Sequence, residues 1–190
     1  MLKFVSSAVF ALFSAGSAIA QDAVTWQEDI QGWSVAVDRT IDNSCFIVSG
    51  FGDEIFLRFQ FNAIQQNVQF IVASTQWDSV KSEKSYDIEV AFGDHGAWES
   101  MAQGHRWNDI LPSLIMTFPV EDQQASNFMK EFTTEGSMSI SYNGSEIATL
   151  ALTGTRAAVA SMLDCQTAMS ETSAQNNATL DPFATDVDPI

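Results

Sequence analysis

The chain has 190 residues, with 8 lysines and arginines against 24 aspartates and glutamates, and a formal net charge of −16 at pH 7. A protein with this excess of negative charge repels phosphate backbones and anionic membrane surfaces, which excludes nucleic acid as an expected partner. The length is sufficient for one domain with a substantial core but short for two. We therefore expect a single acidic domain.

The first twenty residues, MLKFVSSAVFALFSAGSAIA, have the three parts of a secretory signal peptide. Lys3 supplies the positive start, residues 4–13 form an apolar stretch, and residues 18–20 form a small-residue cleavage site. The apolar stretch is shorter than the roughly 20 residues that a membrane-spanning helix needs. We predict a signal peptide at residues 1–20 and an exported product, periplasmic in a Gram-negative cell or secreted, with no membrane span after signal removal.

Alternation of apolar and polar residues dominates the chain after the signal peptide. Trp33, Val35 and Val37, for example, alternate with smaller or polar residues. The segments with this alternation, or with the composition of strands, are residues 33–38, 45–51, 55–62, 68–72, 86–92, 97–101, 114–118, 138–142 and 146–153. Strands with one apolar and one polar face are typical of antiparallel sheets packed on one side. The dipeptide Asn143-Gly144 predicts a tight hairpin between the last two segments.

Arg58 lies inside the apolar segment 55–62. The alternation places it with the polar residues of that segment. We expect its side chain to face water on that polar side rather than to form a buried charge pair.

Two segments have the period of a helix. Residues 121–131 follow Pro119 and repeat apolar residues at spacings of three and four, with acids in the first turn. Residues 155 to about 169 do the same, and Thr155 is a suitable N-cap. We predict a helix over each segment.

The two cysteines, Cys45 and Cys165, lie in a predicted strand and in the second predicted helix. An isolated pair in an oxidising compartment is usually bonded. A redox role is not expected, because the chain has no C-x-x-C motif to lower the pKa of a thiol. We predict a structural disulfide; two buried free thiols and a cysteine-bound metal are the alternatives.

These elements predict a mainly β (α+β) fold. We expect an antiparallel β-sandwich or open barrel of about eight or nine strands with two packed helices, in a single domain over residues 21–170. Residues 171–190 are polar and acidic with two prolines, and we predict a disordered tail there. Within the tail, Leu180, Asp181, Pro182 and Phe183 form a candidate docking motif; the alternative is that they fold back onto the domain.

The stretch FGDHGAWESMAQGHRWND, residues 92–109, contains both histidines of the chain and several acids. We expect a turn at residues 93–96, a return strand at 97–101 and a second turn at Gln103-Gly104. In a straight strand the two histidines would lie roughly 30 Å apart, too far to share a metal ion. In a helix each histidine would pair with an acid four residues later, but the glycines disfavour that helix. The candidate polar site is His95, Glu99, His105 and Asp109, with no metal, cofactor or catalytic residue assigned.

Searches for familiar catalytic motifs find none in this sequence. It has no G-x-S-x-G elbow, phosphate-binding glycine loop, H-E-x-x-H or calcium-binding loop.

Three hypotheses about the function follow from the sequence. The first is a non-catalytic periplasmic binding or adaptor protein that engages a protein partner through a sheet face or the acidic tail. The second is a carrier of a small apolar ligand in a β-barrel, and the third is a metal-assisted hydrolase that uses the region of His95 and His105.

Two segments together resemble small exported proteins of Gram-negative bacteria. They are GWSVAVD…NSCF, within residues 32–46, and LALTGTRAAVASMLDC, residues 150–165. In such proteins a cysteine on an early strand recurs with an alanine-rich closing helix that carries the second cysteine. The resemblance implies a periplasmic location and agrees with the disulfide. It carries over no catalytic residue and no ligand.

Overall fold

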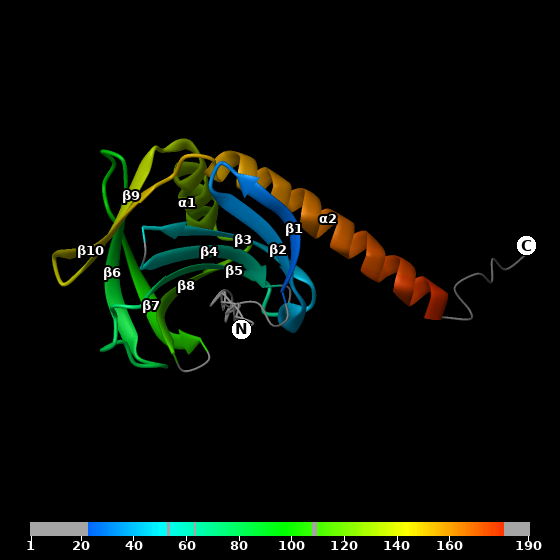
Figure 1. Ribbon diagram of the computed structural model, residues 1–190, viewed down its shortest axis with the longest axis horizontal. Helices are drawn as coiled ribbons and strands as arrows, with labels where there is room; N and C mark the ends of the chain where they lie inside the picture. The colour runs from blue at the N-terminus through cyan, green and yellow to red at the C-terminus, as the bar shows by residue number, and fades with distance from the viewer. Residues whose placement is uncertain (1–22, 53, 63, 108–109, 181–190) are drawn as a thin grey trace, which may run out of the picture.

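The computed structural model describes residues 23–52, 54–62, 64–107 and 110–180. Within these ranges the chain forms one sheet of ten antiparallel strands in the order β1-β2-β3-β4-β5-β8-β7-β6-β9-β10 (Figure 1). The strands are β1 (Ala23–Ile30), β2 (Trp33–Asp38), β3 (Ser44–Phe51), β4 (Ile55–Asn62), β5 (Asn67–Ser74), β6 (Ser85–Phe92), β7 (Trp98–Trp107), β8 (Leu111–Pro119), β9 (Ser137–Tyr142) and β10 (Ser145–Ala151). The helices are a short 3-10 turn η1 (Arg39–Ile41), α1 (Gln123–Thr134) and α2 (Thr155–Leu180).

The mainly β fold with two helices is confirmed, but the sandwich alternative is wrong. A sandwich needs two separate sheets, whereas β5 pairs with β8 along almost its whole length, from Asn67↔Pro119 to Ala73↔Ser113. This ladder joins the first five strands to the last five in one sheet. Figure 1 shows that β6, β7, β9 and β10 run at a steep angle to β2–β5. Both helices lie on one side of the sheet.

Strand β1 is the one strand that alternation did not predict. Its residues are exposed on both faces, with Val24 and Trp26 more than two-fifths exposed, so no face has an apolar pattern. The hairpin at Asn143-Gly144 is confirmed: both residues have positive φ, 52° and 72°, as a tight turn between β9 and β10 requires.

The core lies between one face of the sheet and the two helices. Phe128 and Phe132 of α1 are completely or almost completely buried against it. Phe70 of β5 contacts both rings, with centroid distances of 5.3 and 5.7 Å, and Phe92 of β6 contacts Phe128 at 5.0 Å. Edge-to-face pairs of this kind add about 0.5–1.5 kcal/mol each to the free energy of burial. The first helix therefore packs on strands from both halves of the sheet.

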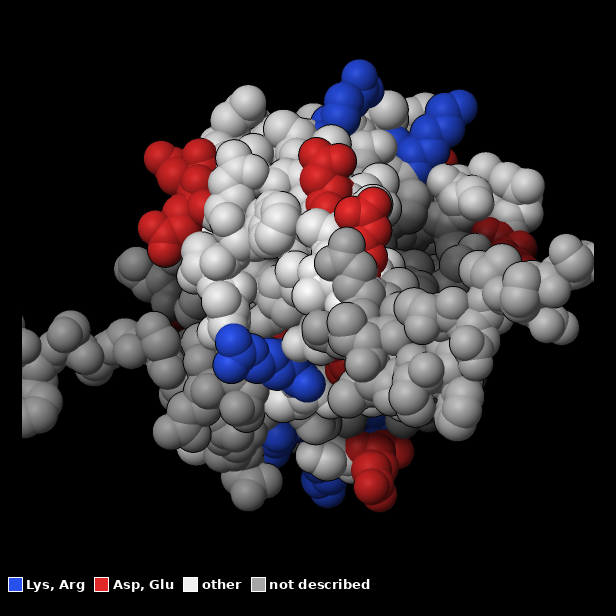
Figure 2. Space-filling view, turned by 90° about the vertical axis from the view of Figure 1, so that its right-hand side faces the viewer, with Lys and Arg blue, Asp and Glu red and all other residues white. Residues whose placement is uncertain are grey.

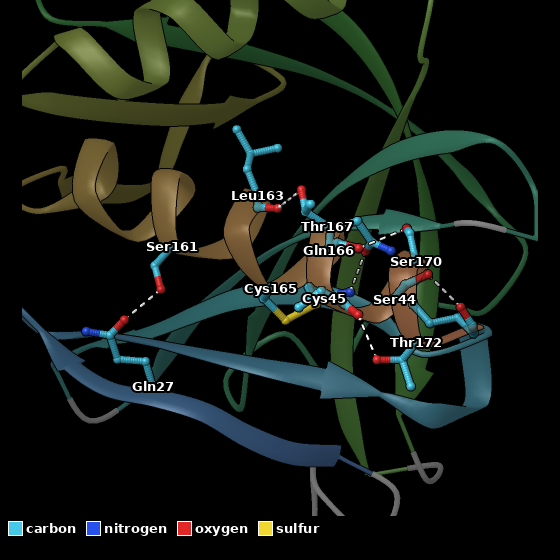
Figure 3. The surroundings of a disulfide bond; sticks show 12 residues. Gln27, Ser44, Cys45, Ser161, Leu163, Cys165, Gln166, Thr167, Ser170 and Thr172 are labelled. Carbon is cyan, nitrogen blue, oxygen red and sulfur yellow. Dashed lines mark hydrogen bonds between the residues drawn. A yellow bond between two sulfur atoms is a disulfide. The ribbon is translucent and has the colours of Figure 1, made fainter. Parts of the chain in front are cut away.

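The second helix is attached to β3 by the predicted disulfide, which is confirmed. Cys45 and Cys165 are fully buried, with their Cα atoms 6.1 Å apart. Next to the disulfide, the side chain of Gln166 accepts a hydrogen bond from the backbone N–H of Cys45 at 2.9 Å (Figure 3). Ser161 donates to Gln27 of β1 at 2.7 Å. These contacts fix α2 across the first three strands.

The same helix extends further than the sequence predicted. Its apolar stripe ends near Met169, where we placed the helix end, but the structure continues it to Leu180. Residues 170–180 contain no glycine or proline, and the first proline that follows, Pro182, disfavours helix at the residue before it. Neither helix in the described part of the chain is long and apolar enough to cross a membrane. The predicted signal peptide and residues 181–190 lie outside the described residues.

The predicted turn at Gln103-Gly104 is wrong, because β7 continues through both residues. Gly104 instead lies where the loop before β6 crosses the strand: its N–H donates to the carbonyl of Lys84 at 2.8 Å, and its own carbonyl accepts from Glu83 at 2.9 Å. A Cβ atom at this position would collide with the backbone oxygen of Lys81 and come within 2.9 Å of the Tyr86 ring. The glycine permits this close approach of two backbones.

Loss of the disulfide should destabilise the fold strongly. The bond closes a loop of 120 residues, which in the chain-entropy model corresponds to about 5 kcal/mol. We expect the Cys45→Ala/Cys165→Ala variant to lose several kcal/mol of unfolding free energy, measured by urea titration. A loss below about 1 kcal/mol would show that the packing of α2 holds without the covalent bond.

Replacement of Gly104 by alanine should also destabilise the protein, by about 1–3 kcal/mol, because the backbone of residue 81 must move. Gly96→Ala is the matched control, since nothing lies within 4 Å of a Cβ at that position. Urea unfolding should show a change within ~0.5 kcal/mol for the control. Equal values for the two variants would contradict the crossing described here.

Candidate functional site

The face of the sheet opposite the helices is not the polar face that the alternation predicted. A second set of buried side chains lies on it over β2–β5 and β8. They are Ala36, Phe46, Arg58, Gln60, Ile71, Ala73 and Ser113. The strand register places them in rows: Ser34, Val48, Arg58 and Ile71 are successive cross-strand neighbours. The middle of the sheet is thus buried on both faces.

A cavity of about 390 Å³ opens on this second face. We call it the apolar pocket. Its wall is mostly apolar, and it is formed by β1–β5 together with the Trp107 end of β7 and the start of β8. Large apolar side chains in the wall are Phe46, Val48, Phe56, Ile71, Trp107 and Leu111. Glu28 and Arg58 are the charged residues among the described lining residues.

Arg58 forms the buried charge pair that we did not expect. Its side chain is 7 % exposed, and its Nη2 lies 2.5 Å from Oδ2 of Asp38 at the end of β2. To reach Asp38 the guanidinium crosses the ring of Phe46, 3.7 Å from the ring centroid, and it lies 5.4 Å from the ring of Trp107. The prediction failed because Asp38 is twenty residues away in sequence, and only the β2–β3–β4 register brings it within reach.

The environment keeps both partners charged at neutral pH. Burial alone would raise the pKa of Asp38, but hydrogen bonds from Thr40 and Arg58 outweigh it and lower the pKa below its ordinary value. The Thr40 backbone N–H and hydroxyl both donate to Oδ1, at 2.9 and 2.6 Å. Burial lowers the pKa of Arg58, and Asp38 opposes that shift. The pair has no net charge.

The pair leaves one donor without an acceptor. The Nε–H of Arg58 is buried and has no hydrogen-bond partner among the described residues, and Oε1 of Gln60, two residues along β4, also has none. A buried polar atom without a partner destabilises a fold by about 1–3 kcal/mol, so native proteins have few of them. Of these two residues, Arg58 lines the apolar pocket.

His95 lies away from the apolar pocket, in the turn between β6 and β7. It is largely exposed, and its Nε2 is 3.3 Å from a carboxylate oxygen of Glu135 at the end of α1. A polar cavity of about 350 Å³ separates this turn from α1, and at its wall Trp98 donates to Glu131 at 2.7 Å. His95 of the turn and Trp98 at the start of β7 thus contact Glu135 and Glu131, two acids of α1 and its C-terminal end that the sequence did not single out.

The other candidate polar residues are elsewhere. Glu99 and His105 belong to the exposed face of β7, opposite the buried Ala102 and Gly104, and the ring of His105 contacts Trp107 at 5.2 Å. In the described part of the chain, no hydrogen bond or ion pair joins His95 to either of them, and no cluster of three possible metal ligands exists. Asp109 lies outside the described residues. The structure therefore does not bring the two histidines into one site.

The tail hypothesis stays a prediction. Leu180 is the last residue of α2, and Asp181, Pro182 and Phe183 lie outside the described residues. On the face of the molecule shown in Figure 2, basic and acidic side chains form small separate groups with uncharged surface between them.

No family model, curated protein or solved structure matches this chain.

A signal for the pocket was nevertheless present in the sequence. Residues 46–48, 55–57 and 70–73 are uninterrupted apolar runs, and such runs are typical of strands buried on both faces. Arg58, which directly follows the second of these runs, lies on the second buried face.

Removal of the charge on Asp38 should destabilise the protein by about 3–5 kcal/mol at neutral pH, because Arg58 would remain charged, buried and uncompensated. We expect this loss for Asp38→Asn in urea unfolding. Asp87→Asn is the control, since Asp87 is exposed on β6, and it should change the unfolding free energy by no more than ~0.5 kcal/mol.

The same variant should alter the pH dependence of stability. Because the pKa of Asp38 is lowered on folding, its contribution is complete above its ordinary pKa of 3.8 and is lost as the pH falls through the lower, folded-state value. Unfolding curves from about pH 7 to about pH 2 should therefore fall less steeply at the acid end for Asp38→Asn than for the wild type. Parallel curves would contradict the lowered pKa.

Proposed function

We propose that this protein binds a small apolar molecule in the apolar pocket. The observation that carries the proposal is a cavity of about 390 Å³ with a mostly apolar wall, located on the sheet face opposite α1 and α2. Sites for small molecules usually have volumes of 300–1,000 Å³ and an apolar wall with a few polar groups. The Arg58–Asp38 pair, in the middle of that face, is such a polar group.

Binding and release, rather than catalysis, fit the residues around the pocket. The described lining contains no histidine or cysteine, and the hydroxyl of Ser49 donates to the carbonyl of Gly32 at 2.8 Å instead of contacting a base. A nucleophile needs a base within hydrogen-bond distance.

The disulfide and the location support the role of a carrier. We infer that the protein acts outside the cytoplasm, because residues 1–20 have the pattern of a signal peptide and a buried structural disulfide suits an oxidising compartment. The disulfide fixes α2 against β3, one of the strands of the pocket. A rigid, preformed pocket binds its ligand with a smaller loss of conformational entropy.

A side chain added at Gly50 should block the pocket. Gly50 lines it, and a Cβ there would meet only the ring of Phe56, at 3.8 Å, so a leucine can extend into the cavity without a backbone clash. We expect Gly50→Leu to weaken binding of the neutral dye Nile red at least about ten-fold, equivalent to about 1.4 kcal/mol, in a fluorescence titration of protein produced from the full-length sequence.

Gly136→Leu is the matched control for this variant. It adds the same side chain at a position with nothing within 4 Å of the Cβ, between α1 and β9 and outside the apolar pocket. Its affinity for Nile red should equal that of the wild type. No dye binding by the wild type, or equal binding by all three proteins, would refute the proposed function.

A further inference from the structure

We propose that the ligand is a cationic amphiphile, an apolar body that ends in an ammonium group, and that the carboxylate of Glu28 binds this group at the β1 side of the apolar pocket. The inference rests on the proposed function and names the chemical class that the pocket selects. Three features of the site carry it: the direction of the Glu28 side chain, its lack of a cationic partner and the charge of the remaining lining.

A β-bulge in β1 directs Glu28 to the pocket. Thr25 and Gln27 of β1 pair with consecutive residues of β2, so β1 has one extra residue between them. The extra residue reverses the alternation of the strand. Gln27 accepts a hydrogen bond from Ser161 of α2 on the helix face (Figure 3), and the side chain after it turns to the opposite face. There Glu28 lines the pocket together with Thr25.

The carboxylate of Glu28 has no cation to balance it. The residue is exposed, and no ion pair joins it to another residue of the described chain. Arg58 is the other charged residue of the described lining, but its guanidinium is bound to Asp38. Arg58 also lies on β4, three strands away from β1, which is roughly 14 Å at about 4.8 Å per strand. Glu28 is therefore the group of the wall that can distinguish ligands by their charge.

The charge of the whole site favours a cation over an anion. Because Asp38 balances Arg58, Glu28 leaves the described lining with one negative charge. The chain adds a net charge of −16, and such a field raises the local concentration of cations at a cleft. A ligand carboxylate would meet no free cation in the described lining and would be repelled by Glu28. An ammonium group supplies the opposite charge and three hydrogen-bond donors.

The apolar wall accommodates the body of the ligand. On the strands beyond β1 and β2 the lining continues with Val48 of β3, Phe56 of β4, Ile71 of β5 and Leu111 of β8. A molecule whose ammonium group lies at Glu28 therefore has apolar surface along its remaining length. We expect a hydrocarbon body that crosses these strands, with the single charged group at its β1 end.

Three probes with the same eight-carbon chain test the preference for a cation. They are octylammonium, octanol and octanoate, each titrated at neutral pH and low salt against Nile red bound to the full-length protein. Octylammonium should displace the dye at a concentration at least about three-fold lower than octanol, and at least about ten-fold lower than octanoate. A preference for octanol or octanoate, or no difference among the probes, would overturn the inference and leave the proposed function intact. Failure of the protein to bind the dye or any probe would instead overturn the proposed function.

A variant assigns the preference to Glu28. Glu28→Gln removes the charge and keeps the size of the side chain. It should raise the octylammonium concentration needed for displacement at least about three-fold and leave that of octanol unchanged. Glu146→Gln is the matched control, because Glu146 is also exposed on an edge strand, β10, but lies outside the pocket lining. Equal effects of the two variants, or no effect of either, would overturn the contact between the ammonium group and Glu28.

Salt dependence tests the same contact without any substitution. The screening length falls from about 30 Å at 0.01 M salt to about 3 Å at 1 M. In 1 M sodium chloride the affinity of the wild type for octylammonium should therefore fall toward its affinity for octanol, whereas octanol should bind no more weakly than at low salt. A preference for octylammonium of the same size at both salt concentrations would overturn the inference.

Discussion

Burial of the Arg58–Asp38 pair is the constraint on which the second face of the sheet depends. A guanidinium removed from water must keep its charge and find both an opposite charge and acceptors. Asp38 supplies the charge, Thr40 holds Asp38 with two hydrogen bonds, and the ring of Phe46 supports the plane of the guanidinium. Because the charge of Arg58 is paired, β2–β5 can remain mostly apolar on the side away from the helices. An unpaired arginine at that position would have required contact with water.

The helices and the disulfide act on the opposite face, yet they stabilise the same strands. Phe132 of α1 contacts Phe59 of β4 at 5.8 Å and Trp33 of β2 at 6.0 Å, and the disulfide attaches α2 to β3. Since side chains alternate along a strand, the residues packed on the helices are the immediate neighbours of those that line the pocket. Tight packing on one side therefore fixes the shape of the pocket on the other.

Local pattern predicted most of the strands, the first helix, the Asn143-Gly144 hairpin and the disulfide, because each depends on neighbouring residues or on the pairing of only two cysteines. The failures needed information from distant residues. Gly104 looked like a turn until the loop at Lys81 was placed over it, and Arg58 looked exposed until the register brought Asp38 near. Strand β1 has no buried face and so no pattern. The pocket required all of these placements at once.

The two histidines and the pocket show why rare residues are a poor guide to a site in this fold. His95 and His105 drew attention because they are the only histidines of the chain, but they are exposed and belong to different surroundings, one beside Glu135 and the other beside Trp107. The pocket is made of common residues, and its one unusual property is a buried arginine, paired with Asp38, in a mostly apolar wall. In a sheet buried on both faces, the free energy of polar groups removed from water is the better guide. It directs attention to Arg58, whose buried charge needs the partner that only the strand register supplies.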